Sequence, residues 1–136
     1  MKGFIKISFA VLGLVFLQSC NNDAYEITGV QARKIDSVII DQDTMTIFNM
    51  QPIKVFSTYN KECEGFYGVD YIPQDSTRTV VNYAYKNNQT CQEGTYRAFN
   101  LIRFEPQKKG TYYFKFWQGK NASGENIWLE KQIVVE

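Results

Sequence analysis

The chain has 136 residues, of which 44% are hydrophobic and 15% aromatic, with 15 basic and 14 acidic side chains and no histidine. This near-neutral charge gives no reason to expect a nucleic acid or an anionic surface as a partner. Because histidine is absent, a histidine-dependent catalytic or metal site is excluded.

The first 20 residues have the pattern of a bacterial export signal. Lys2 and Lys6 give a positively charged start, and the apolar run 7–17 is too short to span a bilayer. Ser19 is the small residue that precedes a cleavage site, and Cys20 follows it. We therefore expect a signal peptide over residues 1–19, rather than a transmembrane helix or a core strand.

The stretch Leu17-Gln18-Ser19-Cys20 resembles the processing box of bacterial lipoproteins. That resemblance implies lipidation of Cys20, which would become the first residue of the mature chain. Two or three acyl chains anchor a protein stably, whereas one gives marginal binding. The expected location is the cell envelope, with the membrane as a partner through the lipid. Asn21 stands where some groups of bacteria use Asp for inner-membrane retention, which favours the outer membrane.

After the signal, residues 20–34 are polar and have no sustained period, which predicts a lipidated N-terminus and tether. Residues 35–136 then form one domain, with short runs of Val, Ile, Tyr, Phe and Thr between Gly, Pro, Asn and Asp. Residues 44–49 are a candidate for an extra short strand. Seven main strands are predicted: 35–40, 52–59, 66–72, 78–85, 96–104, 111–117 and 127–135. This spacing predicts an all-β sandwich of two sheets with antiparallel strands.

The start of the strand at 111–117 resembles the tyrosine corner of immunoglobulin-like domains. Gly110-Thr111-Tyr112 follows a turn, and Tyr112 and Phe114 share one face of the strand. The resemblance implies that the Tyr112 hydroxyl bonds back across the turn. It also implies that Phe114 takes the place of a core cysteine of antibody domains, facing Val55.

The mature chain as a whole is similar to a group of small exported lipoproteins with one immunoglobulin-like domain. The stretches that carry this similarity are Phe66-Tyr67-Gly68-Val69-Asp70-Tyr71-Ile72-Pro73, Thr90-Cys91 and Gly110-Thr111-Tyr112-Tyr113-Phe114-Lys115-Phe116-Trp117. The group implies a fold and a location, but no activity and no catalytic residue.

Cys63 and Cys91 are the only cysteines besides Cys20. An exported chain lies in an oxidising compartment, so we predict a disulfide between them; a metal or catalytic thiol would lack partners. In a seven-strand sandwich, the loops that carry these two cysteines lie at the same end. We expect the tether and the loop 118–126 at that end too, and Glu136 at the opposite end.

The outer face of the last two predicted strands is the best candidate binding surface. A register that places Lys115 opposite Glu130 also pairs Trp117 with Trp128, and both pairs are favourable across strands. Tyr113 lies on the same face. Exposed aromatic side chains suit sugar rings, peptides or a partner protein. The alternative is that another strand, the tether or a loop covers this face.

Three Asp-Ser/Thr sequences resemble the acceptor motif for O-glycosylation of exported proteins in some Gram-negative bacteria. They make Ser37, Thr44 and Ser76 candidate modification sites. The alternative is chance, because the motif is short and Ser and Thr are common in β proteins.

No nucleotide-binding, nucleophile or EF-hand motif is present, so we predict no catalytic residue, no metal site and no cofactor. The sequence therefore predicts a membrane-anchored, non-enzymatic lipoprotein that presents an immunoglobulin-like domain for binding or assembly. Its expected partner is an envelope protein or a glycan. The alternatives are a structural subunit of an envelope complex and a hydrolase of unrecognised type.

Overall fold

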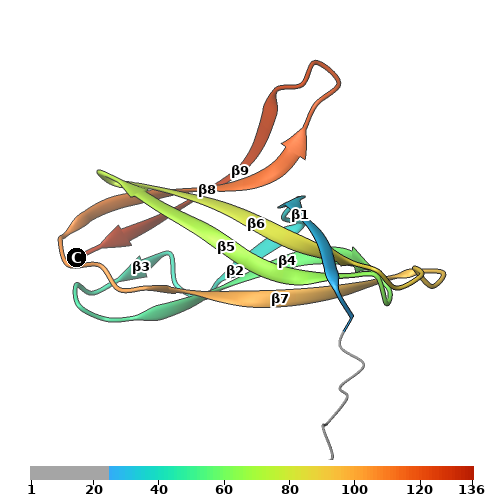
Figure 1. Cartoon of the computed structure of the whole chain (residues 1–136). Helices are drawn as coiled ribbons and strands as arrows, with labels where there is room; N and C mark the ends of the chain where they lie inside the picture. The colour runs from blue at the N-terminus through green and yellow to red at the C-terminus, as the bar shows by residue number, and fades with distance from the viewer. Residues whose placement is uncertain (1–24) are drawn as a thin grey trace, which may run out of the picture.

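The computed structural model describes residues 25–136, in which all regular structure is β (Figure 1). In chain order the strands are β1 (Ile27–Arg33), β2 (Ser37–Ile40), β3 (Thr44–Met45), β4 (Gln51–Asn60), β5 (Glu64–Gln74), β6 (Thr77–Asn87), β7 (Thr95–Phe104), β8 (Gly110–Lys120) and β9 (Asn126–Val135). In this part of the chain no helix has the length and hydrophobicity needed to cross a bilayer. The predicted signal peptide and Cys20 lie outside the described residues.

The strands form two sheets that share one core, so the predicted all-β sandwich is confirmed. The smaller sheet is antiparallel, in the order β2-β4-β7. In the larger sheet, β5 pairs along one edge of β6. The other edge of β6 pairs first with β8 and then with β1, and β9 and β3 follow beyond β8.

The core is made by alternate residues of facing strands, as the two-residue period of a strand requires. β4 buries every second side chain, and β8 buries Tyr112, Phe114 and Phe116. The two sheets meet where Phe104 of β7 packs edge-on against Phe114 of β8, with ring centroids 5.0 Å apart. Phe114 and Val55 both lie in this core and have no exposed surface.

The predicted tether is too long, because residues 27–33 form β1. Its backbone pairs antiparallel with β6, from Ile27 opposite Asn87 to Arg33 opposite Asn82. Six of its seven residues are exposed, so the strand has no hydrophobic period that a sequence pattern would reveal. The domain therefore begins at β1, several residues before the expected boundary at 35.

The arrangement also departs from a seven-strand immunoglobulin-like domain. There are nine strands, and the pairs β6·β8 and β3·β9 are parallel rather than antiparallel. In an immunoglobulin sheet the third strand lies beside the sixth. The third and sixth predicted strands correspond to β5 and β8, but β5 lies at the edge of the sheet and β6 separates it from β8. A tight turn at Asp75, with φ of 52°, joins β5 to β6 and places β6 between β5 and β8. The Ser76 carbonyl then accepts a hydrogen bond from the Tyr113 N–H at 2.9 Å.

The tyrosine corner is confirmed. The Tyr112 hydroxyl donates a hydrogen bond of 2.7 Å to the carbonyl of Lys108, four residues earlier. This bond fixes the turn that joins β7 to β8, on the far side of the core from the disulfide.

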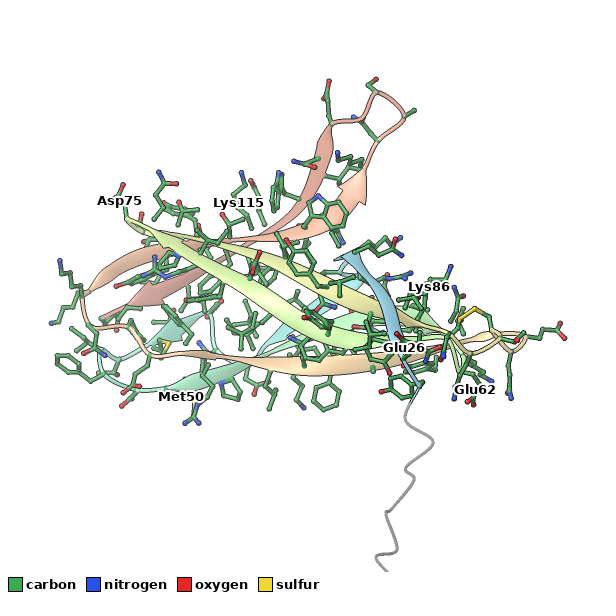
Figure 2. All side chains as sticks on the ribbon, in the orientation of Figure 1. Glu26, Met50, Glu62, Asp75, Lys86 and Lys115 are labelled. Carbon is green, nitrogen blue, oxygen red and sulfur yellow. A yellow bond between two sulfur atoms is a disulfide. The ribbon has the colours of Figure 1, made fainter. Side chains whose placement is uncertain are left out.

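The disulfide joins Cys63 and Cys91, whose Cα atoms are 4.7 Å apart. The first described residues lie at the same end: Glu26 and Asn88 exchange hydrogen bonds, from the Glu26 N–H to Asn88 Oδ1 and from the Asn88 N–H to the Glu26 carbonyl. Figure 2 shows Glu26 and Glu62 together at this end, and Figure 1 shows the C-terminus at the other. These expected positions are confirmed.

The expected position of the loop 118–126 is wrong. The tip of the β8–β9 hairpin rises away from the body of the sandwich and does not join the disulfide end (Figure 1). The register shifts between Trp117 and Lys120, and Gly119 lies in this shift with φ of 93°. A bulge of this kind bends a hairpin, which explains why its tip leaves the sheet.

Candidate functional site

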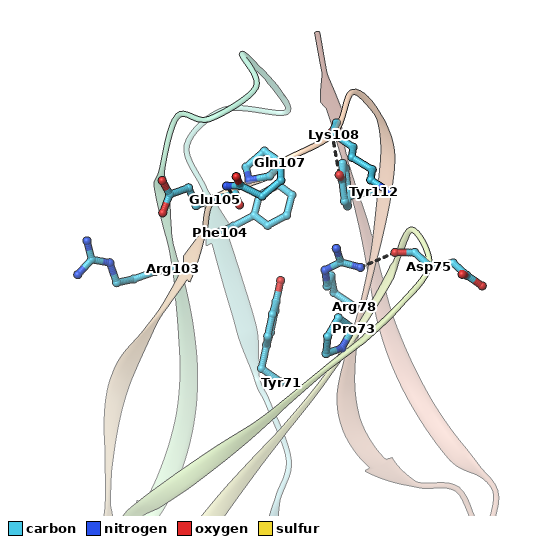
Figure 3. A pocket seen from close by; sticks show the side chains of 11 residues that line it. Tyr71, Pro73, Asp75, Arg78, Arg103, Phe104, Glu105, Gln107, Lys108 and Tyr112 are labelled. Carbon is cyan, nitrogen blue, oxygen red and sulfur yellow. Dashed lines mark hydrogen bonds between the residues drawn. The ribbon is translucent and has the colours of Figure 1, made fainter.

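A cavity of about 450 Å³ lies at the end of the sandwich opposite the disulfide (Figure 3). The ends of four strands build it, and the side chains that define its inner walls are Tyr71 of β5, Arg78 of β6, Phe104 of β7 and Tyr112 of β8. The pair Tyr71 and Arg78 is far in the sequence from the pair Phe104 and Tyr112, and the two pairs meet because β6 lies beside β8. We refer to this cavity as the far-end pocket.

Arg78 is held rigidly in the far-end pocket. Its Nη1 donates hydrogen bonds to the carbonyls of Asp75 at 2.8 Å and Thr77 at 3.0 Å. The guanidinium also lies over the Tyr112 ring, 5.0 Å from its centroid. A guanidinium fixed in this way is a prepared hydrogen-bond donor and positive charge for a ligand.

The Tyr71 hydroxyl is a second polar group of the pocket, and in Figure 3 it points into the space between Phe104 and Arg78. Burial raises the pKa of this phenol, and the positive charge of Arg78 opposes the rise only in part. Tyr71 is therefore a neutral donor at physiological pH. The charged ends of Asp75, Arg103 and Glu105 point away from the pocket in the same view, which leaves Arg78 and Lys108 as the charged groups of the lining.

Aromatic walls with one fixed cation and a neutral hydroxyl are suited to binding a small ring or an anionic group. No nucleophile paired with a base lines the pocket. Within residues 25–136 there is also no cluster of His, Cys, Asp and Glu that could hold a metal ion.

The register predicted for the last hairpin is confirmed: Trp117 pairs with Trp128, Lys115 with Glu130 and Tyr113 with Gln132. The resulting face is only partly open. Tyr113 is 49% exposed, whereas both tryptophans are half-buried.

Neighbours within the hairpin cover the tryptophans. The Lys115 ammonium lies 4.9 Å from the centre of the Trp128 ring, and the Trp117 Nε1–H donates to Asn126 Oδ1 at 3.0 Å. The open part of this face is a shallow cavity of about 520 Å³ beside Tyr113 and Lys115.

Trp117 also borders a third cavity, of about 570 Å³, near the disulfide half of the molecule. Arg33 lies in its wall, and its Nη2 is 2.7 Å from Oε1 of the buried Glu64. Burial acts to raise the pKa of Glu64, but the Asn60 N–H, which donates to Oε2 at 2.9 Å, and the Arg33 charge lower it overall. Arg33 was not predicted as a site residue, because it lies in the segment expected as a tether.

A buried polar cluster lies behind this cavity, between the sheets. Asn82 Nδ2 donates to Ser57 Oγ and to the Tyr59 hydroxyl, both at 2.9 Å, and Asn82 and Ser57 have no exposed surface. Asn82 Oδ1 has no hydrogen-bond partner. Ser57 and Tyr59 share the inward face of β4 with Ile53 and Val55, but no local pattern places Asn82 of β6 against them, so this cluster was not predicted.

The three candidate O-glycosylation sites differ in accessibility. Thr44 and Ser76 are exposed, in β3 and in the β5–β6 turn. Ser37 is half-buried, and its hydroxyl accepts a hydrogen bond from the Arg97 guanidinium. Of the three, Ser37 is the least suited to modification.

Comparison of the chain with models of known protein families, with curated proteins and with solved structures found no match. The function must therefore be argued from the geometry alone.

Proposed function

We propose that this protein is a non-enzymatic, membrane-anchored lipoprotein of the cell envelope that presents an immunoglobulin-like domain for binding or assembly. The chain joins the domain at the disulfide end, beside Asn88, and the far-end pocket lies at the opposite end. Only residues 21–26 separate Cys20 from β1, and such a segment spans at most about 25 Å when extended. A lipid on Cys20 would thus keep the disulfide end near the membrane and leave the pocket facing away, available to a partner.

Residues of both sheets support an immunoglobulin-like origin for the domain. The β2-β4-β7 sheet has the order of the first, second and fifth strands of such a domain, and Tyr112 forms the corner. The place of β6 beside β8 is a departure, so we propose a divergent member of this class. The outer membrane is the proposed location.

Metabolic labelling with an alkyne palmitate in a bacterium that expresses the full chain tests the anchor. We expect label on the wild type and on the double variant Cys63→Ser/Cys91→Ser, which serves as the control. Cys20→Ser should lose the label and leave the membrane fraction. Label that persists in Cys20→Ser would refute the proposal.

A glycan is the second candidate partner, because the far-end pocket combines aromatic walls with Arg78 and the Tyr71 hydroxyl. Binding to a panel of neutral and acidic oligosaccharides tests this. We expect Tyr71→Ala to abolish binding and Tyr113→Ala, on the hairpin face, to leave it unchanged.

The remaining alternatives are a structural subunit of an envelope complex and a hydrolase. The lack of histidine and of a paired nucleophile argues against the hydrolase.

A further inference from the structure

The outer side of the smaller sheet carries an unusual row of side chains on β7. Arg97, Phe99, Leu101 and Arg103 alternate with inward residues, and Phe99 and Leu101 are each 53% exposed. We call these four residues the β7 row. A sheet face in contact with water normally carries polar residues at such positions, so two adjacent exposed apolar side chains point to a contact surface.

β7 is also an edge strand over its full length of ten residues. Among the described residues it pairs only with β4, and the ten pairs run from Thr95 opposite Asn60 to Phe104 opposite Gln51 without a register shift. Its other edge therefore presents a straight row of unpaired N–H and C=O groups, which is a template for a further strand.

The other edge strands are protected in ways that β7 is not. β5 has a register shift between Phe66 and Gly68 and contains Pro73, and β1 has a shift near Gly29. β2 and β3 have only four and two residues. Bulges, prolines and short length are the usual means of preventing strand addition. β7 has none of them and is the one long, regular edge in the described part of the chain.

The charges of this face select the partner. Lys54 lies over the Phe99 ring at 5.5 Å from its centroid, and Arg97 lies over the Phe56 ring at 4.4 Å. Within residues 25–136 the single ion pair joins Arg33 and Glu64. Lys54, Arg97 and Arg103 therefore have no carboxylate of these residues within 4.0 Å. Three unpaired cations around an apolar centre are complementary to an acidic partner.

A second copy of this chain would bring the same three cations to the edge and so offers it no complementary charge. An antiparallel β7–β7 pair centred on Asn100 would place Arg97 directly opposite Arg103, twice. Like charges directly opposite each other destabilise a strand pair. We therefore propose that β7 binds an extended acidic segment of another protein by strand addition. The segment would present acidic, apolar, apolar and acidic side chains at alternate positions to the β7 row.

This inference rests on the proposed function only for the location of the partner protein, which is the cell envelope. A fluorescent peptide Glu-Thr-Val-Ser-Val-Thr-Glu has the required alternation and reads the same in both strand directions. Its anisotropy with the full chain should show saturable binding below about 1 mM, the weak end of specific affinities. The same peptide with Lys in place of both Glu should not bind.

Two N-methylated peptides test the backbone contact. One carries methyl groups on the odd-numbered amides and the other on the even-numbered amides, so only one set faces β7 in an added strand. We expect one of the two peptides to lose binding and the other to keep it. If both bind equally, the peptide does not add as a strand, and the proposal is overturned.

Charge reversal tests the row itself. Arg97→Glu/Arg103→Glu should weaken binding at least about tenfold, as expected for rim charges that pair with a ligand. Lys86→Glu/Lys131→Glu makes the same charge change at exposed positions of the larger sheet and should have no effect. Equal affinity for both double variants, or no binding of the acidic peptide to the wild type, would overturn the proposal.

Sedimentation of the wild type tests the other occupant. A dimer that the peptide dissociates would assign the edge to a second copy of the chain instead. Acylation of Cys20 plays no part in this assay, so its outcome and that of the labelling experiment are separate.

Discussion

Asn82 is the residue on which the polar half of the core depends. It is fully buried and donates to both Ser57 and Tyr59. Asn82→Ala leaves two buried hydroxyls without that donor, and an unsatisfied buried polar group costs about 1–3 kcal/mol. We expect urea unfolding to show a loss of about 2 kcal/mol. Asn49→Ala, at an exposed turn, is the control, and equal stability of the two variants would contradict this role.

Glu64 gives the fold a specific dependence on pH. Its pKa is lower in the folded chain than in the unfolded chain, where it is about 4.3. The ionised form therefore stabilises the fold fully above about pH 5, and this contribution is lost as the pH falls through 4.3 and then through the folded-state pKa. Thermal melts between pH 7 and pH 3 should show a steeper loss of stability for the wild type than for Glu64→Gln. Parallel curves would be inconsistent with this ion pair.

At the scale of residues, the sequence predicted what depends on local pattern. Tyr112 and the pairing of Trp117 with Trp128 follow from two-residue alternation near a turn, and both are confirmed. Tyr71 and Arg78 lie diagonally across the β5–β6 hairpin, but their approach to Tyr112 was not predicted, because it depends on which strand lies beside β8. No local signal encodes that choice.

At the scale of elements, the disulfide ties the β4–β5 turn to the loop before β7. The bond closes a loop of 28 residues, which contributes about 3–4 kcal/mol in the chain-entropy description. Cys63→Ala/Cys91→Ala should lower the free energy of unfolding by this amount in urea titrations. A reducing agent should lower the stability of the wild type equally and leave the double variant unchanged. A reductant effect on the double variant would show that the loss has another source.

The bend of the β8–β9 hairpin depends on Gly119, which has φ of 93°. A side chain is strained in this region by about 1–2 kcal/mol. Gly119→Ala should therefore destabilise the fold by about 1 kcal/mol in thermal unfolding. Gly29→Ala is the matched control, since its added Cβ meets nothing within 4 Å and its φ is not positive. Similar losses in both variants would argue against a strained bulge.

The strands themselves were largely predictable from residue 51 onward, where side chains alternate between the core and solvent. β1 was missed for a physical reason. Its stability comes from backbone pairing with β6 and not from burial of its own side chains, so Ile27 and Val30 give no hydrophobic period. The bend of the hairpin was missed because a bulge is set by one backbone conformation.

At the scale of the whole molecule, the two ends of the sandwich differ. The chain joins at the disulfide end, and the far-end pocket and Glu136 lie at the other. The β7 row runs along the side between these ends, so a short lipid anchor would leave both surfaces accessible from the envelope space.

Energy transfer to acceptor-labelled vesicles from the full chain, with the proposed lipid on Cys20, tests this direction most directly. A donor is placed on a cysteine introduced at an exposed position, Lys86→Cys near the disulfide end or Lys109→Cys at the far end. We expect strong transfer from position 86 and weaker transfer from position 109, and no transfer from either when Cys20 is replaced by Ser. Equal transfer from both positions, or stronger transfer from position 109, would contradict the account.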